Sequence, residues 1–196
     1  MNYILNIETA TKNCSVALAQ EGKIILCKEI AEEGYSHAER LHVFIEEIIQ
    51  EAGICFQDIN AIAVSQGPGS YTGLRIGVSA AKGLCYALNI PLIAVDTLQV
   101  LALQAKVAEG LIVPMLDARR MEVYSAIFNA KLEKQRDVQA EIITENSFES
   151  IAVTVYFVGD CADKCQSVLV KNVIFIKSRF LFLRYDKILF LKRNYV

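Results

Sequence analysis

The segment that decides the fold is AIAVSQGPGSYTGLRIGVSAAKGLCYAL, residues 61–88. Its first five residues are small or β-branched, which is typical of a buried strand. Residues 67–73 form a glycine-rich turn, and an apolar helix is expected from about Thr72 to Leu88. A strand, a turn and a helix in this order predict a crossover unit of a parallel sheet, so the chain belongs to the α/β class.

The residues before this unit predict an antiparallel start to the same sheet. Short apolar runs at 4–7, 14–19 and 24–28 are separated by polar turns, which predicts a β-meander. A helix is expected over 37–52, because its apolar residues recur at intervals of three and four and Gly53 follows as a stop.

After the unit, the pattern of the N-terminal region returns. A buried strand over 91–95 and a short capped helix lead to Gly110. The apolar strand that follows ends in Asp117 at a hairpin turn, just as the run 4–7 ends in Glu8. We therefore predict a duplicated fold of two halves, each with a mixed sheet and flanking helices. The expected halves are residues 1–108 and 109–196.

Composition indicates a cytoplasmic protein. Hydrophobic residues make up 54% of the chain and charged residues 21%, and no apolar run reaches the roughly 18 residues that span a bilayer. The first residues enter a strand pattern without the basic region of a signal peptide, so we expect no export. Six cysteines lie on apolar segments without a Cys-x-x-Cys pair, and we expect them to be reduced core thiols. They are Cys14, Cys27, Cys55, Cys85, Cys161 and Cys165.

The charge is unevenly distributed. The chain carries −2 overall, but residues 177–196 hold six basic residues against Asp186, which gives this end +5 and leaves −7 for the remainder. The body therefore offers no attractive field for nucleic acid, whereas the C-terminal end could act as a basic arm. The same end is also rich in Phe and Leu.

The glycine-rich turn suggests two functions. Glycines between a strand and a helix let backbone N–H groups approach a phosphate at the helix N-terminus. However, a Walker loop needs Lys where Leu74 stands, and a dinucleotide loop needs Gly where Thr72 stands. The alternative is close packing, because the helix carries small residues on two faces and its own sheet covers one of them. Docking of another molecule is the favoured interpretation, and nucleotide binding stays open.

Other chemistry has less support. His37 and His42 are five residues apart, about 140° around a helix, so they cannot bind one metal ion from one face. Ser36 fits a helix cap better than a nucleophile. Glu8 and Asp117 could face one cleft from the two halves, although hydrogen bonding within their own turns is the simpler explanation.

Several motifs together resemble the TsaB (YeaZ) family. Their order and spacing agree over about residues 1–128, with a looser match to Ile176. The motifs are IETAT at 7–11, CSVA at 14–17, SHAERL at 36–41, GPGSYTGLRIG at 67–77, AKGL at 81–84 and DARRMEVY at 117–124.

The resemblance implies an actin-like, hexokinase-like duplicated fold. It also implies a role in making N6-threonylcarbamoyladenosine at position 37 of tRNAs that read codons beginning with A. The chain would be a non-catalytic subunit without a cofactor or metal, which binds the catalytic subunit TsaD through a helix bundle and helps recruit the ATPase TsaE. It would form a homodimer in isolation and reach tRNA only through the complex. The sequence agrees, since it lacks the histidine pair expected of TsaD and has only Gly159 after Gly110.

We place the partner surface on the two helices of the first half, and a vestigial cleft at the turns of both halves. The expected partner residues are Leu41, Ile45, Arg75, Ile76, Gly77, Ala80, Gly83 and Ala87. The expected cleft residues are Glu8, Thr9, Gly67, Gly69, Ser70, Asp117 and Arg119.

Two other functions remain as alternatives. A small-molecule kinase or ATPase of the same fold should carry glycine-rich phosphate contacts in both halves. A glycoprotease-like metallopeptidase is opposed by the histidine spacing. Residues 177–196 depart from the acidic end usual in the family, which suggests an altered or truncated C-terminus after residue 176.

Overall fold

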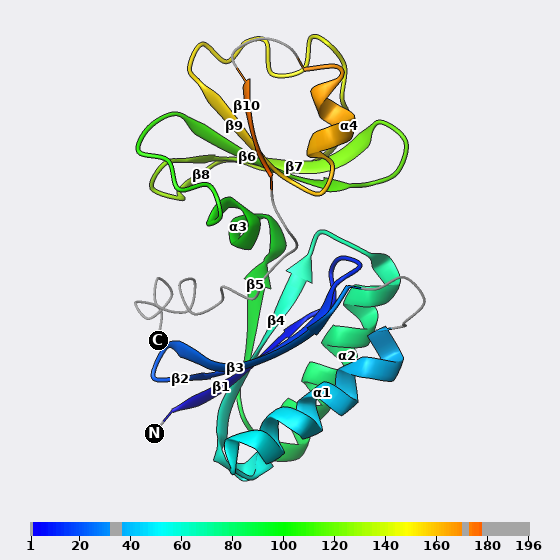
Figure 1. Ribbon diagram of the computed structural model, residues 1–196, viewed down its shortest axis with the longest axis vertical. Helices are drawn as coiled ribbons and strands as arrows, with labels where there is room; N and C mark the ends of the chain where they lie inside the picture. Colours follow the sequence, from blue (N-terminus) through cyan, green and yellow to red (C-terminus); the bar gives the residue numbers. More distant parts are fainter. Residues whose placement is uncertain (1, 32–36, 170–172, 178–196) are drawn as a thin grey trace. The chain divides into compact units, whose positions relative to one another are not determined.

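The computed structural model describes residues 2–31, 37–169 and 173–177 (Figure 1). These residues divide into two compact units, residues 2–97 and 98–177, so the division falls ahead of the expected boundary at residue 108. Two predictions, the helix cap at Ser36 and the basic end over 178–196, lie outside the described residues. Among the described residues, no helix has the length and apolar character needed to cross a membrane.

The first unit is built on a five-stranded mixed sheet with the order β3-β2-β1-β4-β5. The central strand β1 pairs antiparallel with β2 and parallel with β4, and β4 pairs parallel with β5. The predicted meander and crossover unit are thus both confirmed. The strands are β1 (Tyr3–Glu8), β2 (Cys14–Gln20), β3 (Lys23–Ile30), β4 (Ile59–Gly67) and β5 (Leu92–Asp96), and a short 3-10 helix, η1 (Phe56–Asp58), precedes β4.

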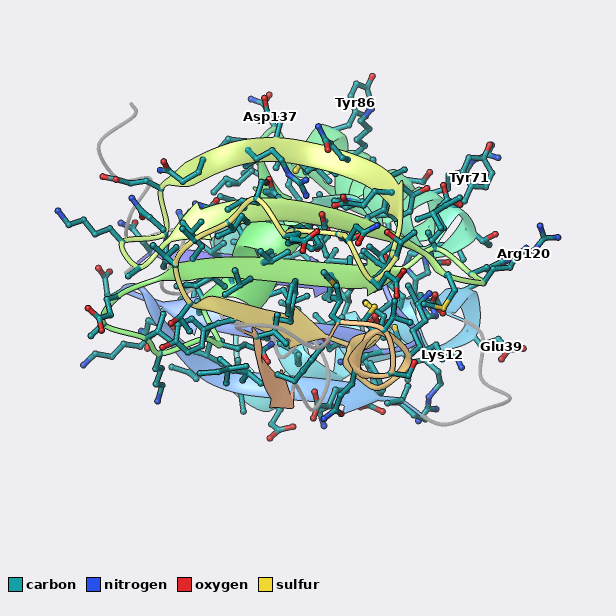
Figure 2. All side chains as sticks on the ribbon, turned by 90° about the horizontal axis from the view of Figure 1, so that it is seen from above. Lys12, Glu39, Tyr71, Tyr86, Arg120 and Asp137 are labelled. Atoms are coloured by element: carbon teal, nitrogen blue, oxygen red, sulfur yellow. The ribbon has the colours of Figure 1, made fainter. Side chains whose placement is uncertain are left out.

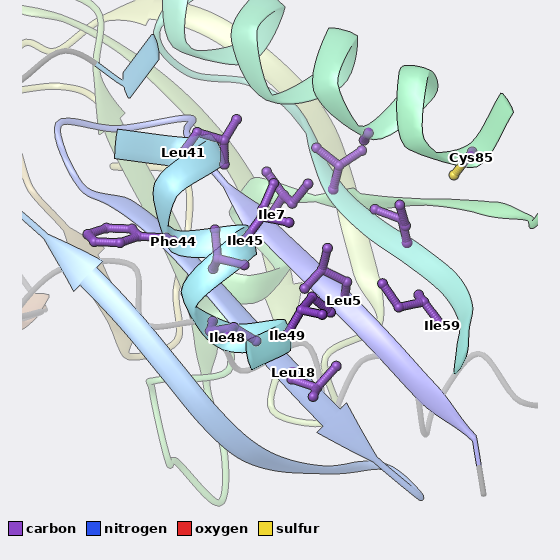
Figure 3. Close-up of a cluster of buried hydrophobic side chains, with 14 of the residues drawn as sticks. Leu5, Ile7, Leu18, Leu41, Phe44, Ile45, Ile48, Ile49, Ile59 and Cys85 are labelled. Atoms are coloured by element: carbon purple, nitrogen blue, oxygen red, sulfur yellow. The ribbon is translucent and has the colours of Figure 1, made fainter. Parts of the chain in front are cut away.

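Two helices, α1 (His37–Ala52) and α2 (Tyr71–Leu88), cover one face of this sheet. Figure 3 shows the apolar stripe of α1, including Leu41, Ile45 and Ile48, lying over Leu5 and Leu18 of the sheet. Each such side chain contributes about 1.5–3 kcal/mol when it leaves water completely. The whole stripe of α1 is therefore used inside the unit.

The second unit repeats the sheet of the first. Its strand order is β8-β7-β6-β9-β10, so the first strand is again central, with the second antiparallel and the fourth parallel beside it. This shared order confirms the duplicated fold. The elements are α3 (Thr97–Ala102), which begins at the last residue of the first unit, β6 (Leu111–Asp117), β7 (Glu122–Asn129), β8 (Lys134–Ile142), β9 (Val155–Gly159), α4 (Ala162–Gln166) and β10 (Val173–Lys177).

The helices distinguish the two units. Residues 143–154, between β8 and β9, contain turns where the first unit has α1, and α4 has 5 residues where α2 has 18. The core on this side of the second sheet is instead filled by aromatic residues, with Phe157 lying 5.3 Å from Phe148 and 5.4 Å from Phe175 between ring centroids.

The cysteines differ in part from the expectation of core thiols. All six are free, and four are buried, but Cys27 and Cys55 are exposed. Cys27 lies on β3, whose residues alternate between exposed and half-buried because this edge strand has one face in water.

Candidate functional site

The turn after β1 is held by the acid that ends the strand. Glu8 is fully buried, its Oε1 accepts a hydrogen bond from the Ala10 amide at 2.6 Å, and its Oε2 accepts one from the Ser65 hydroxyl. Burial, and secondly the Glu8 carboxylate, raise the pKa of the Cys14 thiol to about 11. Hydrogen bonding within the turn thus accounts for Glu8.

The N-terminal end of α2 closes over the same turn. The Ser70 amide donates to the Ala10 carbonyl at 2.6 Å, and the Thr9 hydroxyl donates to the Gly73 carbonyl at 2.7 Å. The Ser70 hydroxyl caps the helix by accepting from the Gly73 amide at 3.2 Å. From α1, Nε2 of His37 lies 2.6 Å from the Thr11 carbonyl, to which it donates.

Three glycines allow this close approach. A Cβ atom on Gly69, Gly73 or Gly77 would lie less than 3.0 Å from an atom of Ala10 or Thr9. We call these contacts the glycine seam. The seam explains the glycines by packing, and it directs the Ser70 and Gly73 amides to acceptors within the chain rather than to an anion.

The opposite side of α2 is open to water. Tyr71 and Tyr86 are 74% and 91% exposed, and Figure 2 shows both side chains projecting from the helix. A Cβ atom on Gly83 would have no atom of the described residues within 4 Å. The Arg75 guanidinium lies over the Tyr71 ring and donates to its hydroxyl at 3.1 Å. We call this surface the outer face of α2; it comprises Tyr71, Arg75, Ser79, Lys82, Gly83, Tyr86 and Ala87, all exposed.

The structure corrects three of the residues expected on the partner surface. Leu41 and Ile45 are buried in the core because the stripe of α1 faces its own sheet, and Gly77 is buried against Thr9. These three residues therefore do not line an open surface. Ile76 and Ala80 are half-buried against the core, and the exposed members are Arg75, Gly83 and Ala87.

The second unit holds Asp117 and Arg119 of the expected cleft. Asp117 Oδ1 accepts from the Arg119 amide at 2.9 Å, which matches the Glu8 to Ala10 bond of the first unit, and it also pairs with the Lys164 ammonium. In the first unit Glu8, Thr9, Gly69 and Ser70 meet around one turn, and the half-buried Gly67 ends β4 beside it.

Sequence reasoning missed Ser65 and Lys164. Ser65 is the polar residue at the end of the buried strand expected over 61–65, and this position was a usable signal. Lys164 gave no signal, since it is one of many charged residues. No three His, Cys, Asp or Glu side chains within the described ranges are grouped so that they could hold a metal ion.

Comparison with known proteins agrees with the motifs. The family model described as "TsaD: tRNA N6-adenosine threonylcarbamoyltransferase" matches residues 29–174. The chain is 38% identical to the tRNA threonylcarbamoyladenosine biosynthesis protein TsaB of Bacillus subtilis over 128 residues, which are 65% of this chain and 56% of the relative. It is 39% identical to TsaB of Escherichia coli over 136 residues, 68% of this chain and 55% of the relative.

The matched region thus spans little more than half the length of these curated relatives. Among solved structures, YeaZ from Pseudomonas aeruginosa superposes with a TM-score of 0.81 at 26% identity, covering 99% of this chain and 94% of that one. This likeness extends over both units and agrees with the duplicated fold. By the family model, the relatives and the fold together, the chain belongs to the TsaD family and, within it, to the TsaB (YeaZ) group.

Proposed function

We propose that this chain is a non-catalytic subunit of the assembly that adds the threonylcarbamoyl group to N6 of adenosine 37 in tRNAs reading codons that begin with A. The names of its relatives support the pathway, since they are called tRNA threonylcarbamoyladenosine biosynthesis proteins. In this proposal the chain binds the catalytic subunit TsaD, helps recruit the ATPase TsaE, and reaches tRNA through the complex.

The observation that carries the proposal is the outer face of α2. A glycine inside a helix costs about 0.5–1 kcal/mol relative to alanine, and among the described residues Gly83 makes no close contact that would require a glycine. Tyr86, three residues on, places a large ring almost wholly in water. A glycine has no side chain to hold a neighbour away, and exposed aromatic rings beside it provide apolar contact area. Such a surface suits the close approach of a helix from another molecule.

Two different partners can bind the outer face of α2, one at a time. TsaD is the partner in the complex, and a second copy of the chain can occupy the same face in its absence, because a two-fold axis brings identical surfaces together. We therefore expect a homodimer in isolation that exchanges for a heterodimer when TsaD is added.

The glycine seam supports a role without catalysis. In a nucleotide-binding turn, backbone amides at the helix N-terminus are directed at the ligand phosphates. Here the Ser70 and Gly73 amides donate to Ala10 and Ser70 of the chain itself. The glycine motif that most resembles a phosphate loop is thus used to join α2 to the turn after β1.

The test compares leucine substitutions on two exposed surfaces. Gly83→Leu and Ala87→Leu enlarge the outer face of α2, while Ala140→Leu on β8 enlarges an exposed position of the second unit. Overfilling a close contact costs about 1–3 kcal/mol, so TsaD affinity should fall about 10- to 100-fold in the first two variants and stay unchanged in the third. Light scattering reports the dimer, and circular dichroism checks the fold.

The same variants should be assayed for nucleoside modification. In cells that lack their own TsaB, the parent chain should restore threonylcarbamoyladenosine in tRNA, and Gly83→Leu should restore less. If all three variants bind TsaD as the parent does, the interface lies elsewhere. If the parent neither binds TsaD nor restores the nucleoside, the proposed function is wrong.

A further inference from the structure

The duplicated fold contains two equivalent turns that are closed differently. Each follows the first strand of its sheet, and in each the acid at the strand end accepts the amide two residues later. In the first unit the turn is enclosed by α1 and α2, so that Ala10 is buried and Thr11 half-buried. In the second unit Arg119 and Arg120 occupy the corresponding positions and are exposed.

One lysine fixes the second turn. The Lys164 ammonium pairs with Asp117 and donates to the carbonyls of Arg120 at 2.8 Å and Glu122 at 2.9 Å. The turn is closed further by the Ala118 amide, which donates to the Glu122 carbonyl at 3.1 Å, and by Asp160, which accepts from the Asp117 amide at 3.0 Å. The backbone of this turn is therefore determined from both of its ends.

The two arginines are held in an uncommon conformation. Their φ angles are 75° for Arg119 and 49° for Arg120, in the left-handed region that Gly, Asn and Asp adopt more readily. Within the part of the chain that the structure describes, neither guanidinium has an acidic partner. Figure 2 shows the Arg120 side chain extending away from the ribbon. The turn thus presents two cations that have no acidic partner among the described residues, and its backbone is fixed.

We propose that the Arg119–Arg120 turn contacts phosphates of the tRNA backbone when the chain acts in its complex. This inference rests on the proposed function. A guanidinium binds phosphate through two parallel hydrogen bonds, and such contacts position a nucleic acid without reading its bases. A protein partner is less well matched, because protein interfaces centre on buried apolar anchors. The exposed residues of this turn are charged: Asp117, Arg119, Arg120 and Glu122.

The test uses asparagine, which suits the left-handed region. The double variant Arg119→Asn, Arg120→Asn removes both charges while favouring the turn. The control Lys106→Ala, Lys131→Ala removes two exposed charges elsewhere in the second unit. Binding of tRNA is measured by filter retention against salt, for the complex with TsaD and for the chain alone at 50 mM salt.

We expect the asparagine variant to unfold at the same temperature as the parent or a higher one, yet to bind tRNA about tenfold more weakly at 0.1 M salt. Loss of two phosphate contacts should also reduce the slope of log affinity against log salt by about 1.5. The control should change neither quantity by a comparable amount. In the double variant Arg119→Lys, Arg120→Lys the salt slope should stay the same, because both charges remain. The tRNA affinity should fall in part, because an ammonium cannot make the two parallel hydrogen bonds of a guanidinium.

Three results would overturn the inference. Unchanged tRNA affinity in the asparagine variant would exclude the contact, and an equal loss in the control would reduce it to a general charge effect. Loss of TsaD binding with unchanged tRNA binding would make the turn a protein contact. If no complex with TsaD forms, the proposed function fails, and the titration of the chain alone still decides whether the turn binds RNA.

Discussion

Two glycines on α2 should respond oppositely to the same substitution. Gly77 belongs to the glycine seam, where a Cβ atom would overlap the Thr9 hydroxyl, whereas a Cβ atom on Gly83 would have no neighbour within 4 Å in the described part of the chain. Both residues are interior positions of one helix, so the intrinsic preference of the helix for alanine is the same at each. The pair Gly77→Ala and Gly83→Ala therefore isolates the effect of the seam.

The expected magnitudes follow from the contacts. Alanine in place of Gly83 should raise the free energy of unfolding by about 0.5–1 kcal/mol. At Gly77 the same gain is opposed by about 1–3 kcal/mol of overpacking. If Thr9 turns aside, its 2.7 Å bond to the Gly73 carbonyl is also lost, at about 0.5–1.5 kcal/mol. Gly77→Ala should thus be about 1–3 kcal/mol less stable than the parent.

Urea denaturation followed by circular dichroism measures both changes. With a slope of about 2 kcal/mol per molar urea, the midpoints of the two variants should differ by about 1–2 M, with Gly83→Ala the higher. If Gly77→Ala is as stable as Gly83→Ala, α2 does not approach the turn after β1 as closely as the structure has it. The packing explanation of the glycine motif would then be wrong.

Two further predictions concern the same unit. Ser65→Ala removes the hydroxyl that donates to the buried Glu8 carboxylate and should lower the free energy of unfolding by about 1.5–3 kcal/mol. The control Ser79→Ala, on the outer face of α2, should change the free energy of unfolding by no more than about 0.5 kcal/mol. Equal urea midpoints for the two variants would contradict this account. The second prediction concerns brief treatment of the native protein with iodoacetamide at pH 8. Cys14, whose pKa is about 11, should be thiolate in about one molecule in a thousand and remain unmodified, while the exposed Cys55 should react. Early modification of Cys14, detected by mass spectrometry, would refute its burial beside Glu8.

Sequence patterns predicted the helices and strands because the signals for each element lie within its own stretch of sequence. The run over 61–88 contains its own strand, turn and helix signals, and the structure has β4 and α2 there. Periodicity was less informative about partners. It identified two small-residue faces on α2, but it could not tell which face the chain itself covers, and so Gly77 was placed on the open side.

The contacts that fix the turns could not be predicted in this way, because they join residues far apart in the sequence. Thr9 meets Gly73 across 64 positions, Ser65 meets Glu8 across 57, and Lys164 meets Asp117 across 47. Each pair follows from strand order and register, which bring the ends of parallel neighbours together at one edge of a sheet. Patterns within one sequence, considered without an alignment, predict the strands but not their register.

The first turn is enclosed and the second exposed because the helices that follow the fourth strands of the two sheets differ in length. In the first unit α2 has 18 residues, and its glycines let its backbone reach the turn directly. In the second unit α4 has 5 residues, and the long side chain of Lys164 spans the remaining distance. A backbone contact encloses the turn, whereas a side-chain contact fixes it and leaves its tip in water. One sheet topology can therefore yield a closed structural turn in one half and an exposed turn with a fixed backbone in the other.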